Sequence, residues 1–244
     1  MKGKLIVIEG IDACGKETQT SLLIEKFKKE GLSAVRFSFP DYSTSTGKKI
    51  KQKLHQQKHI YSNPLTDGFA ELFALNLKEK REELVNYLQR GFYIISDRYE
   101  PSNEAYQSAK LPEKDRRFFK NYIRELYFKK YKVPKPNLII FLNLAPKLCT
   151  ILMKNRKKID AYERNLAFLE KVYSIYLNLS HENNWISVEC SLNKNPSLRL
   201  GTFFLQNKNP SLRSRTLLLR NKKILPKEEI AQKIWQKIKP KLNL

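Results

Sequence analysis

The sequence predicts one α/β domain built on a five-stranded parallel sheet with helices on both faces. Three features support this: short apolar runs, longer helical patterns between them, and a glycine-bearing loop directly after the first run. Several runs are apolar on successive residues, as expected of strands that are covered on both faces. The predicted strands are KLIVIEG (Lys4–Gly10), SAVRFSFP (Ser33–Pro40), FYIISDRY (Phe92–Tyr99), NLIIFLNL (Asn137–Leu144) and WISVECS (Trp185–Ser191).

Helical patterns fill the intervals between these runs and close the chain. Strand–helix alternation predicts a parallel sheet, and ligands of such sheets bind at the carboxyl ends of the strands. Chemically active side chains are therefore expected at those ends. The predicted helices are Lys16–Glu30, Pro64–Arg90, Ser102–Lys110, Glu113–Tyr131, Pro146–Arg156, Asp160–Ser180 and an amphipathic Lys227–Ile238.

Composition narrows the possible classes of protein but does not identify a specific partner. The 244 residues include 47 Lys and Arg against 24 Asp and Glu, a net charge of +23. This charge favours polyanions such as nucleotides, nucleic acid or an acidic membrane surface, but lysine is spread along the whole chain, so a generally basic surface is the favoured interpretation. Cys14, Cys149 and Cys190 lack the spacing of a disulfide framework or a zinc site. Without a signal-peptide layout or an apolar run of about 20 residues, a cytoplasmic protein is expected.

One basic segment departs from the strand–helix pattern. The string NKNPSLR at Asn193–Arg199 recurs at Asn207–Arg213, a period of 14 residues, and Ser191–Pro226 carries eight Lys or Arg and no acid. Two interpretations compete: a basic arm that contacts nucleic acid, and a loop insertion. We favour the insertion because long surface loops cost little stability. The predicted organisation is a single domain over residues 1–244 with a repeat-containing basic loop at 191–226.

A phosphate-binding loop follows the first predicted strand in the string EGIDACGKETQT (Glu9–Thr20). Gly10, Gly15 and Lys16 match the spacing G-x-x-x-x-G-K between a strand and a helix, which predicts a P-loop NTPase fold. In such a loop, backbone N–H groups and the helix N-terminus hold phosphate oxygens, and the lysine neutralises them. The alternative, a glycine-bearing turn with a surface lysine, is disfavoured by the spacing. The predicted ATP-binding residues are Gly10, Ile11, Asp12, Ala13, Cys14, Gly15, Lys16, Glu17 and Thr18.

The residue after Lys16 is Glu17, where the motif has a Ser or Thr that binds Mg²⁺. A carboxylate is also a hard oxygen ligand suited to Mg²⁺. Glu17 is therefore predicted to replace the hydroxyl as a metal ligand, directly or through water. The alternative is that Thr18 takes this role.

A second cluster of polar residues, SDRYEPSNEAYQSAK (Ser96–Lys110), lies at the end of the third predicted strand. Asp97 is predicted to hold the water shell of Mg²⁺, and Arg98 is predicted to bind a second phosphate. An ion pair at the strand end is the alternative for these two residues. The turn and helix that follow offer ring faces and an amide to a base, from Tyr99, Ser102, Tyr106 and Gln107.

These motifs resemble the thymidylate kinase family of nucleoside monophosphate kinases over nearly the whole chain apart from 191–226. The string D-R-Y-x-x-S-x-x-A-Y-Q is specific to that family. The resemblance implies a Mg²⁺-dependent transferase of nucleotide biosynthesis that uses ATP to convert dTMP to dTDP, and a homodimer. The matching motifs are EGIDACGKETQ, FPDYSTSTGKKI (Phe39–Ile50), LFALN (Leu72–Asn76), DRYEPSNEAYQ (Asp97–Gln107) and NRKKIDAYE (Asn155–Glu163).

The resemblance also assigns roles to single residues. Lys16, Arg98 and Arg156 are the implied catalytic residues, with Arg156 in a short lid at Asn155–Glu163 over the ATP phosphates. Glu17 and Asp97 remain the predicted metal ligands. The implied substrate-binding residues are Asp12 near the sugar 3′-hydroxyl, Phe73 stacked on thymine, Arg98 on the acceptor phosphate, Tyr106 beside the deoxyribose, Gln107 on the base, and Ser102 and Tyr42 at the same site.

Two positions depart from the family pattern. The arginine of the family's F-P-x-R motif is Tyr42 here, and a second acceptor arginine, four residues after the stacking aromatic, is Leu77. Lys48, Lys78 or Arg81 would have to compensate. The departures leave two alternatives to a thymidylate kinase: a monophosphate kinase of other specificity, such as for dUMP, or a weakened paralogue. A nucleic-acid-binding P-loop protein is a more distant alternative.

Overall fold

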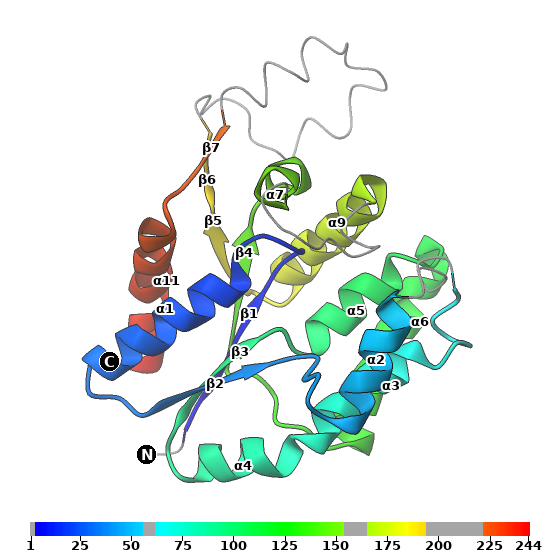
Figure 1. The fold of residues 1–244 in the computed structure, drawn as a ribbon, viewed down its shortest axis with the longest axis horizontal. Coiled ribbons are helices and arrows are strands. Elements are labelled where there is room, and N and C mark those ends of the chain that lie inside the picture. Colours follow the sequence, from blue (N-terminus) through cyan, green and yellow to red (C-terminus); the bar gives the residue numbers. More distant parts are fainter. Residues whose placement is uncertain (1–2, 56–61, 154–164, 194–221) are drawn as a thin grey trace.

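The computed structural model describes residues 3–55, 62–153, 165–193 and 222–244 (Figure 1). Its centre is a five-stranded sheet in the order β2-β3-β1-β4-β5, with every neighbouring pair parallel. The predicted α/β fold is thereby confirmed. The strands are β1 (Leu5–Glu9), β2 (Ala34–Ser38), β3 (Tyr93–Asp97), β4 (Leu138–Asn143) and β5 (Ile186–Glu189).

Both faces of the sheet are buried, and β1 shows why its first four residues, Leu5 to Ile8, are all apolar. All five residues of β1 are buried. Ile6 and Ile8 belong to the core shared with α1 (Lys16–Lys29) and α11 (Lys227–Leu242), whereas Leu5 and Val7 belong to the core formed with α3 (Phe69–Glu79), α4 (Arg81–Gln89) and α6 (Glu113–Arg124). Because successive side chains of a strand point to opposite faces, a central strand between two helical layers needs apolar residues at nearly every position.

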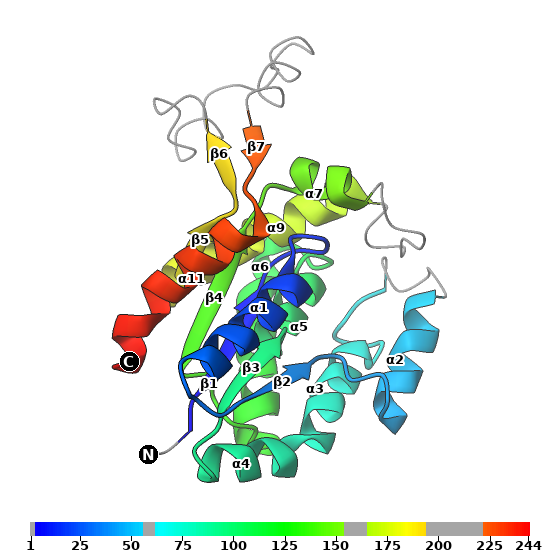
Figure 2. The ribbon, with the colours of Figure 1, turned by 60° about the vertical axis from the view of Figure 1, so that its left-hand side comes forward.

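The helices form a layer on each face. Figure 2 shows α1 (Lys16–Lys29) and α11 (Lys227–Leu242) side by side on one face. On the other face, α5 packs against both α6 and α9. The remaining helices are α2 (Ser45–His55), α3 (Phe69–Glu79), α4 (Arg81–Gln89), α5 (Glu100–Ser108), α6 (Glu113–Arg124) with its π-helical continuation η2 (Glu125–Lys130), α7 (Pro146–Met153) and α9 (Leu166–Glu182). Within the described ranges, no helix is long and apolar enough to cross a membrane.

The clearest differences from the predicted elements lie between α2 and α5. The single helix expected at Pro64–Arg90 is two helices, because Lys80 adopts φ −98° and ψ 1° and its N–H closes a tight turn on Leu77 O at 3.1 Å. The helix α2 was not predicted. The helix α5 begins at Glu100, two residues early, since Pro101 fits the first helical turn, where its missing N–H has no partner to lose.

The two ends of the basic segment pair with each other as two short strands. Strand β6 (Ser191–Asn193) pairs antiparallel with β7 (Lys222–Ile224), so the two ends of the segment lie side by side and extend beyond the end of β5 and the start of α11 (Figure 2). The repeated strings lie outside the described residues except for Asn193. The loop insertion remains a prediction.

The helix α5 also carries a buried acidic pair. Glu100 is 5% exposed and Glu104 is 4% exposed. Burial raises the pKa of Glu104 to about 7, against the opposing effect of Lys120 and Arg124, and burial together with Glu104 raises the pKa of Glu100 well above its usual value. The folded protein therefore binds more protons than the unfolded chain over the pH range in which Glu104 would otherwise ionise.

This pair predicts that stability falls as pH rises. The stabilisation is complete below about pH 4.5, the unfolded-state pKa, and is lost as pH rises through about 7, the raised pKa of Glu104. Glu104→Gln is expected to flatten this slope, measured by urea unfolding from about pH 5 to pH 8. Glu113→Gln, which changes an exposed residue of α6, is the control. An unchanged slope in Glu104→Gln contradicts the prediction.

Candidate active site

The phosphate loop (Gly10–Lys16) connects β1 to α1 at the carboxyl edge of the sheet. Gly10 has φ 148°, and a Cβ there would lie 2.7 Å from Cys14 Sγ and 3.1 Å from Leu142 O. Gly15 has φ 96° and is the N-cap of α1. Both positions require glycine, the first because of close packing and the second because of its backbone angle. The loop's spacing thus follows from its conformation.

Lys16 is the first residue of α1 and is 6% exposed. Its ammonium donates a hydrogen bond of 2.8 Å to Ile11 O, inside the loop. Lysine is rarely this buried without a partner, and Ile11 O together with the weak acceptor Cys14 Sγ, 4.0 Å away, does not use all three of its N–H donors. The remaining donors make Lys16 suited to phosphate oxygens held by the same loop.

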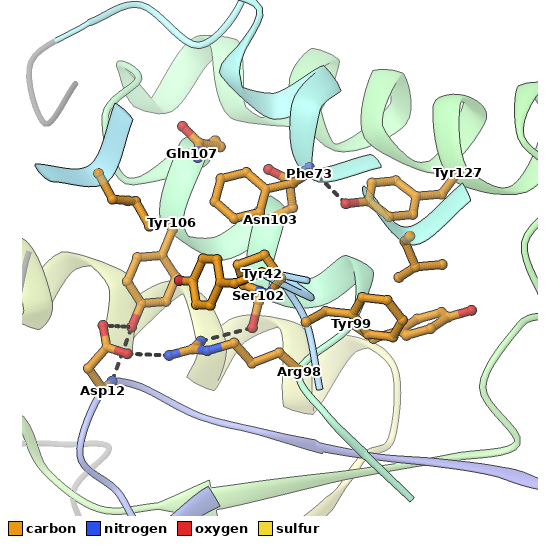
Figure 3. A pocket seen from close by; sticks show the side chains of 14 residues that line it. Asp12, Tyr42, Phe73, Arg98, Tyr99, Ser102, Asn103, Tyr106, Gln107 and Tyr127 are labelled. Carbon is orange, nitrogen blue, oxygen red and sulfur yellow. Dashed lines mark hydrogen bonds and ion pairs between the residues drawn. The ribbon is translucent and has the colours of Figure 1, made fainter. Parts of the chain in front are cut away.

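Asp12 and Arg98 form an ion pair between the phosphate loop and the end of β3. The Arg98 guanidinium bonds Asp12 Oδ1 and also donates to Ser102 Oγ at 3.0 Å (Figure 3). Tyr106 OH donates to Asp12 Oδ2 at 2.6 Å and accepts from Asp12 N at 3.1 Å. Asp12 raises the pKa of Arg98 against the opposing effect of burial. The group is fixed in place before any ligand binds.

The turn that presents Arg98 is held by buried Glu9. Arg98 has φ 69°, a left-handed conformation that costs a non-glycine residue about 1–3 kcal/mol. Glu9 is fully buried and accepts hydrogen bonds from Tyr99 N at 2.9 Å, Ser102 Oγ at 2.7 Å and Tyr176 OH at 2.8 Å. Burial raises the pKa of Glu9, and Arg98 opposes this. Glu9 thus connects the strand before the phosphate loop to the Arg98 turn, a role that the sequence did not indicate.

A cavity opens beside this ion pair (Figure 3). Its polar end is formed by Asp12, Arg98 and Ser102, and aromatic and apolar side chains form its walls. All seven predicted substrate-binding residues, Arg98 among them, therefore surround one space. The lining residues are Asp12, Phe39, Pro40, Tyr42, Leu54, Phe73, Leu77, Arg98, Tyr99, Ser102, Asn103, Tyr106, Gln107 and Tyr127.

Two amide side chains on α5 supply polar atoms to this cavity. Gln107 is 1% exposed and Asn103 is 4% exposed, and their Oε1 and Oδ1 atoms have no hydrogen-bond partner among the described residues. Asn103 Nδ2 donates to Ala70 O at 2.8 Å and contacts Tyr127 OH at 3.0 Å, so its oxygen is left as an acceptor. Sequence reasoning missed Asn103. Its position four residues before Gln107, on the same helix face, was the available signal.

The predicted metal ligands lie in different surroundings. Asp97 ends β3, is 8% exposed and has an Oδ1 without a partner among the described residues. The Glu17 side chain is 78% exposed and lies 3.5 Å from Arg36, and Thr18 is exposed beside it. Across the described part of the chain, no three His, Cys, Asp or Glu side chains form a metal cluster. Arg156 and the predicted lid lie outside the described residues.

Comparisons with known proteins agree with this geometry. A family model described as thymidylate kinase matches residues 8–197. The chain belongs to the thymidylate kinase family. Proteins named thymidylate kinase include one from Plasmodium falciparum, 29% identical over 78% of this chain and 83% of its own length, and one from Schizosaccharomyces pombe, 34% identical over 74% and 79%. A solved thymidylate kinase from Candida albicans is 29% identical, with a TM-score of 0.60 over 77% of this chain and 84% of that chain.

Within this member of the thymidylate kinase family, the two departures from the family pattern both lie at the cavity. Tyr42 is 43% exposed and Leu77 is 1% exposed. Of the suggested substitutes, Arg81 is turned away, because its Nε donates to Lys132 O at 2.8 Å. Lys48 and Lys78 are exposed and do not line the cavity.

Proposed function

We propose that this protein is a thymidylate kinase that transfers the γ-phosphoryl group of ATP to dTMP and forms dTDP and ADP. The observation that carries the proposal is the cavity beside the phosphate loop, with the Asp12–Arg98 pair at one end and the Asn103 and Gln107 amides beside Phe73 at the other. Such a cavity suits a monophosphate that carries a flat base and lies next to a bound triphosphate.

The proposed chemistry is in-line transfer between two held phosphates. Lys16 neutralises the oxygens of the donor phosphate, and Arg98 neutralises those of the acceptor. The acceptor oxygen is already anionic, so no general base is required. Asp12, fixed by Tyr106 and Arg98, accepts a hydrogen bond from the sugar 3′-hydroxyl. We assign to Arg156 the remaining cationic contact to the transferred group, from the lid.

The base-reading residues favour thymine and uracil over cytosine. Because Asn103 Nδ2 is bonded to Ala70 O, Asn103 Oδ1 acts as an acceptor. Thymine and uracil carry an N3–H donor, whereas N3 of cytosine is an acceptor and would leave Oδ1 unpaired. A ring face for stacking comes from Phe73, which is backed by Phe69 at 4.9 Å between centroids.

Magnesium fits this site through Asp97, whose buried carboxylate oxygen lacks a partner among the described residues. Asp97 and Glu17 would hold the ion together with phosphate oxygens and water, as Mg²⁺ prefers. When bound, the ion supplies charge neutralisation at the β- and γ-phosphates. We also propose that the protein forms a homodimer, acts in the cytoplasm and carries residues 191–226 as a loop insertion.

The test of the function is a coupled ADP-release assay with dTMP, dUMP, dGMP and CMP as acceptors. We expect the highest kcat/KM with dTMP and the lowest among the pyrimidines with CMP. ADP release that is equal for all four, or equal with none added, would contradict the proposal.

The role of Glu17 gives a separate prediction. Glu17→Thr restores the motif's hydroxyl in place of a charged ligand, so the Mg²⁺ concentration that gives half-maximal activity is expected to shift by roughly threefold or more. The measurement is a Mg²⁺ titration of activity at saturating ATP and dTMP. Glu25→Thr, on the exposed face of α1, is the control. An identical Mg²⁺ dependence in Glu17→Thr and the unmodified protein would exclude Glu17 as a ligand.

A further inference from the structure

The polar end of the cavity, where the acceptor phosphate would bind, lacks net positive charge. Asp12 and Arg98 are its charged lining residues among those described, and they neutralise each other. A phosphate monoester brings a charge of about −1.5 to −2 at neutral pH. This inference rests on the proposed function, in which the acceptor phosphate needs a further cation.

The two cations at the turn between α3 and α4, Lys80 and Arg81, are engaged elsewhere. Lys80 contacts Asp41 at 3.3 Å and Glu83 at 3.0 Å, and Arg81 donates to Lys132 O. Leu77 itself is buried and apolar. The helix α2, which begins three residues after Tyr42, remains as a source of positive charge.

Lys51 on α2 contacts a residue that lines the cavity. Its ammonium lies 5.9 Å from the centroid of the Tyr42 ring, and Tyr42 lines the cavity. Leu54, three residues later, lines the same cavity. Residues three apart share one face of a helix, so the contact of Leu54 and the cation–π contact of Lys51 independently place this face of α2 at the cavity.

We propose that Lys51, supported by the ring of Tyr42, binds the acceptor phosphate in place of the arginine that the family carries at position 42. The ring face attracts the ammonium and holds it near the cavity, while its exposed position leaves its donors available to a ligand. An ammonium is a point charge and lacks the two-pronged fork of a guanidinium. This contact therefore recognises phosphate charge and contributes nothing to the choice of base.

The test compares binding of dTMP with binding of thymidine, which lacks the phosphate, by isothermal titration calorimetry. Lys51→Met is expected to weaken dTMP binding roughly tenfold and to leave thymidine binding unchanged, since one charge-assisted contact is lost. Lys51→Arg is expected to retain dTMP affinity. Lys49→Met is the matched control: Lys49 is an exposed lysine of α2 two residues away, about 200° around the helix axis.

Steady-state kinetics give a second readout. Lys51→Met should raise KM for dTMP while KM for ATP stays constant. Equal weakening of dTMP and thymidine would show a packing role and overturn the inference, and so would unchanged dTMP affinity. If the unmodified protein neither binds nor phosphorylates dTMP, the proposed function fails together with the inference. Turnover of dTMP that is insensitive to Lys51→Met overturns the inference alone.

Discussion

Lys16→Met is expected to lower kcat/KM for phosphoryl transfer by roughly a thousandfold, because a preorganised cation is lost from the donor phosphate. The Lys16 ammonium is already inside the phosphate loop, held by Ile11 O at 2.8 Å. The loop Gly10–Lys16 contains no other cationic side chain to replace it. The measurement is steady-state kinetics with ATP and dTMP at saturating Mg²⁺.

The control separates loss of catalysis from loss of folding. Lys28→Met changes an exposed lysine near the end of the same helix and should retain full activity. Thermal unfolding of both variants should resemble that of the unmodified protein. A Lys16→Met protein that is folded and keeps activity within about tenfold would show that the loop is not the donor site.

Arg98→Met is expected to produce the second largest loss, roughly a hundredfold or more in kcat/KM for dTMP. The guanidinium bridges Asp12 and Ser102, so its removal takes away the acceptor cation and leaves Asp12 without its ion-pair partner. KM for dTMP should rise and kcat should fall, with KM for ATP little changed. Arg98→Lys should recover only part of the loss, since an ammonium cannot span both partners.

The matched control for Arg98 is Arg117→Met, an exposed arginine on α6. It should retain unmodified kinetics. The prediction is contradicted if Arg98→Met changes KM for ATP as much as KM for dTMP, since that result would place Arg98 at the donor side.

The sheet and the phosphate loop could be predicted from the sequence, and particular residues show the physical reason. A strand such as Leu5–Glu9, buried on both faces, is apolar at consecutive positions from Leu5 to Ile8, and no helix periodicity competes with it. Gly10 and Gly15 occupy backbone conformations that strongly favour glycine, so the motif reports geometry directly. These features depend on residues that are close together in the chain, so they can be recognised in a single sequence.

The parts that were missed depend on contacts between distant segments. The helix α2 has the lysine-rich sequence STGKKIKQKLH, in which Ile50 and Leu54 are the large apolar residues, and its short apolar face is evident only once Ile50 is seen to be fully buried. Glu9 looks like an ordinary strand end, and its three donors come from residues 90 or more positions away in the chain. Asn103 could be recognised as an acceptor only after its amide hydrogens were seen bonded to Ala70 and Tyr127.

The central claim is that the phosphate loop holds the phosphoryl donor and the neighbouring cavity holds the phosphoryl acceptor of the same reaction. Its most direct test supplies ATP radiolabelled at the γ-phosphate, dTMP and Mg²⁺ to the purified protein and separates the nucleotides by chromatography. The label should move to dTDP in step with ADP formation, and should stay on ATP when dTMP is omitted. Label released as inorganic phosphate, or retained on ATP in the presence of dTMP, would contradict the claim.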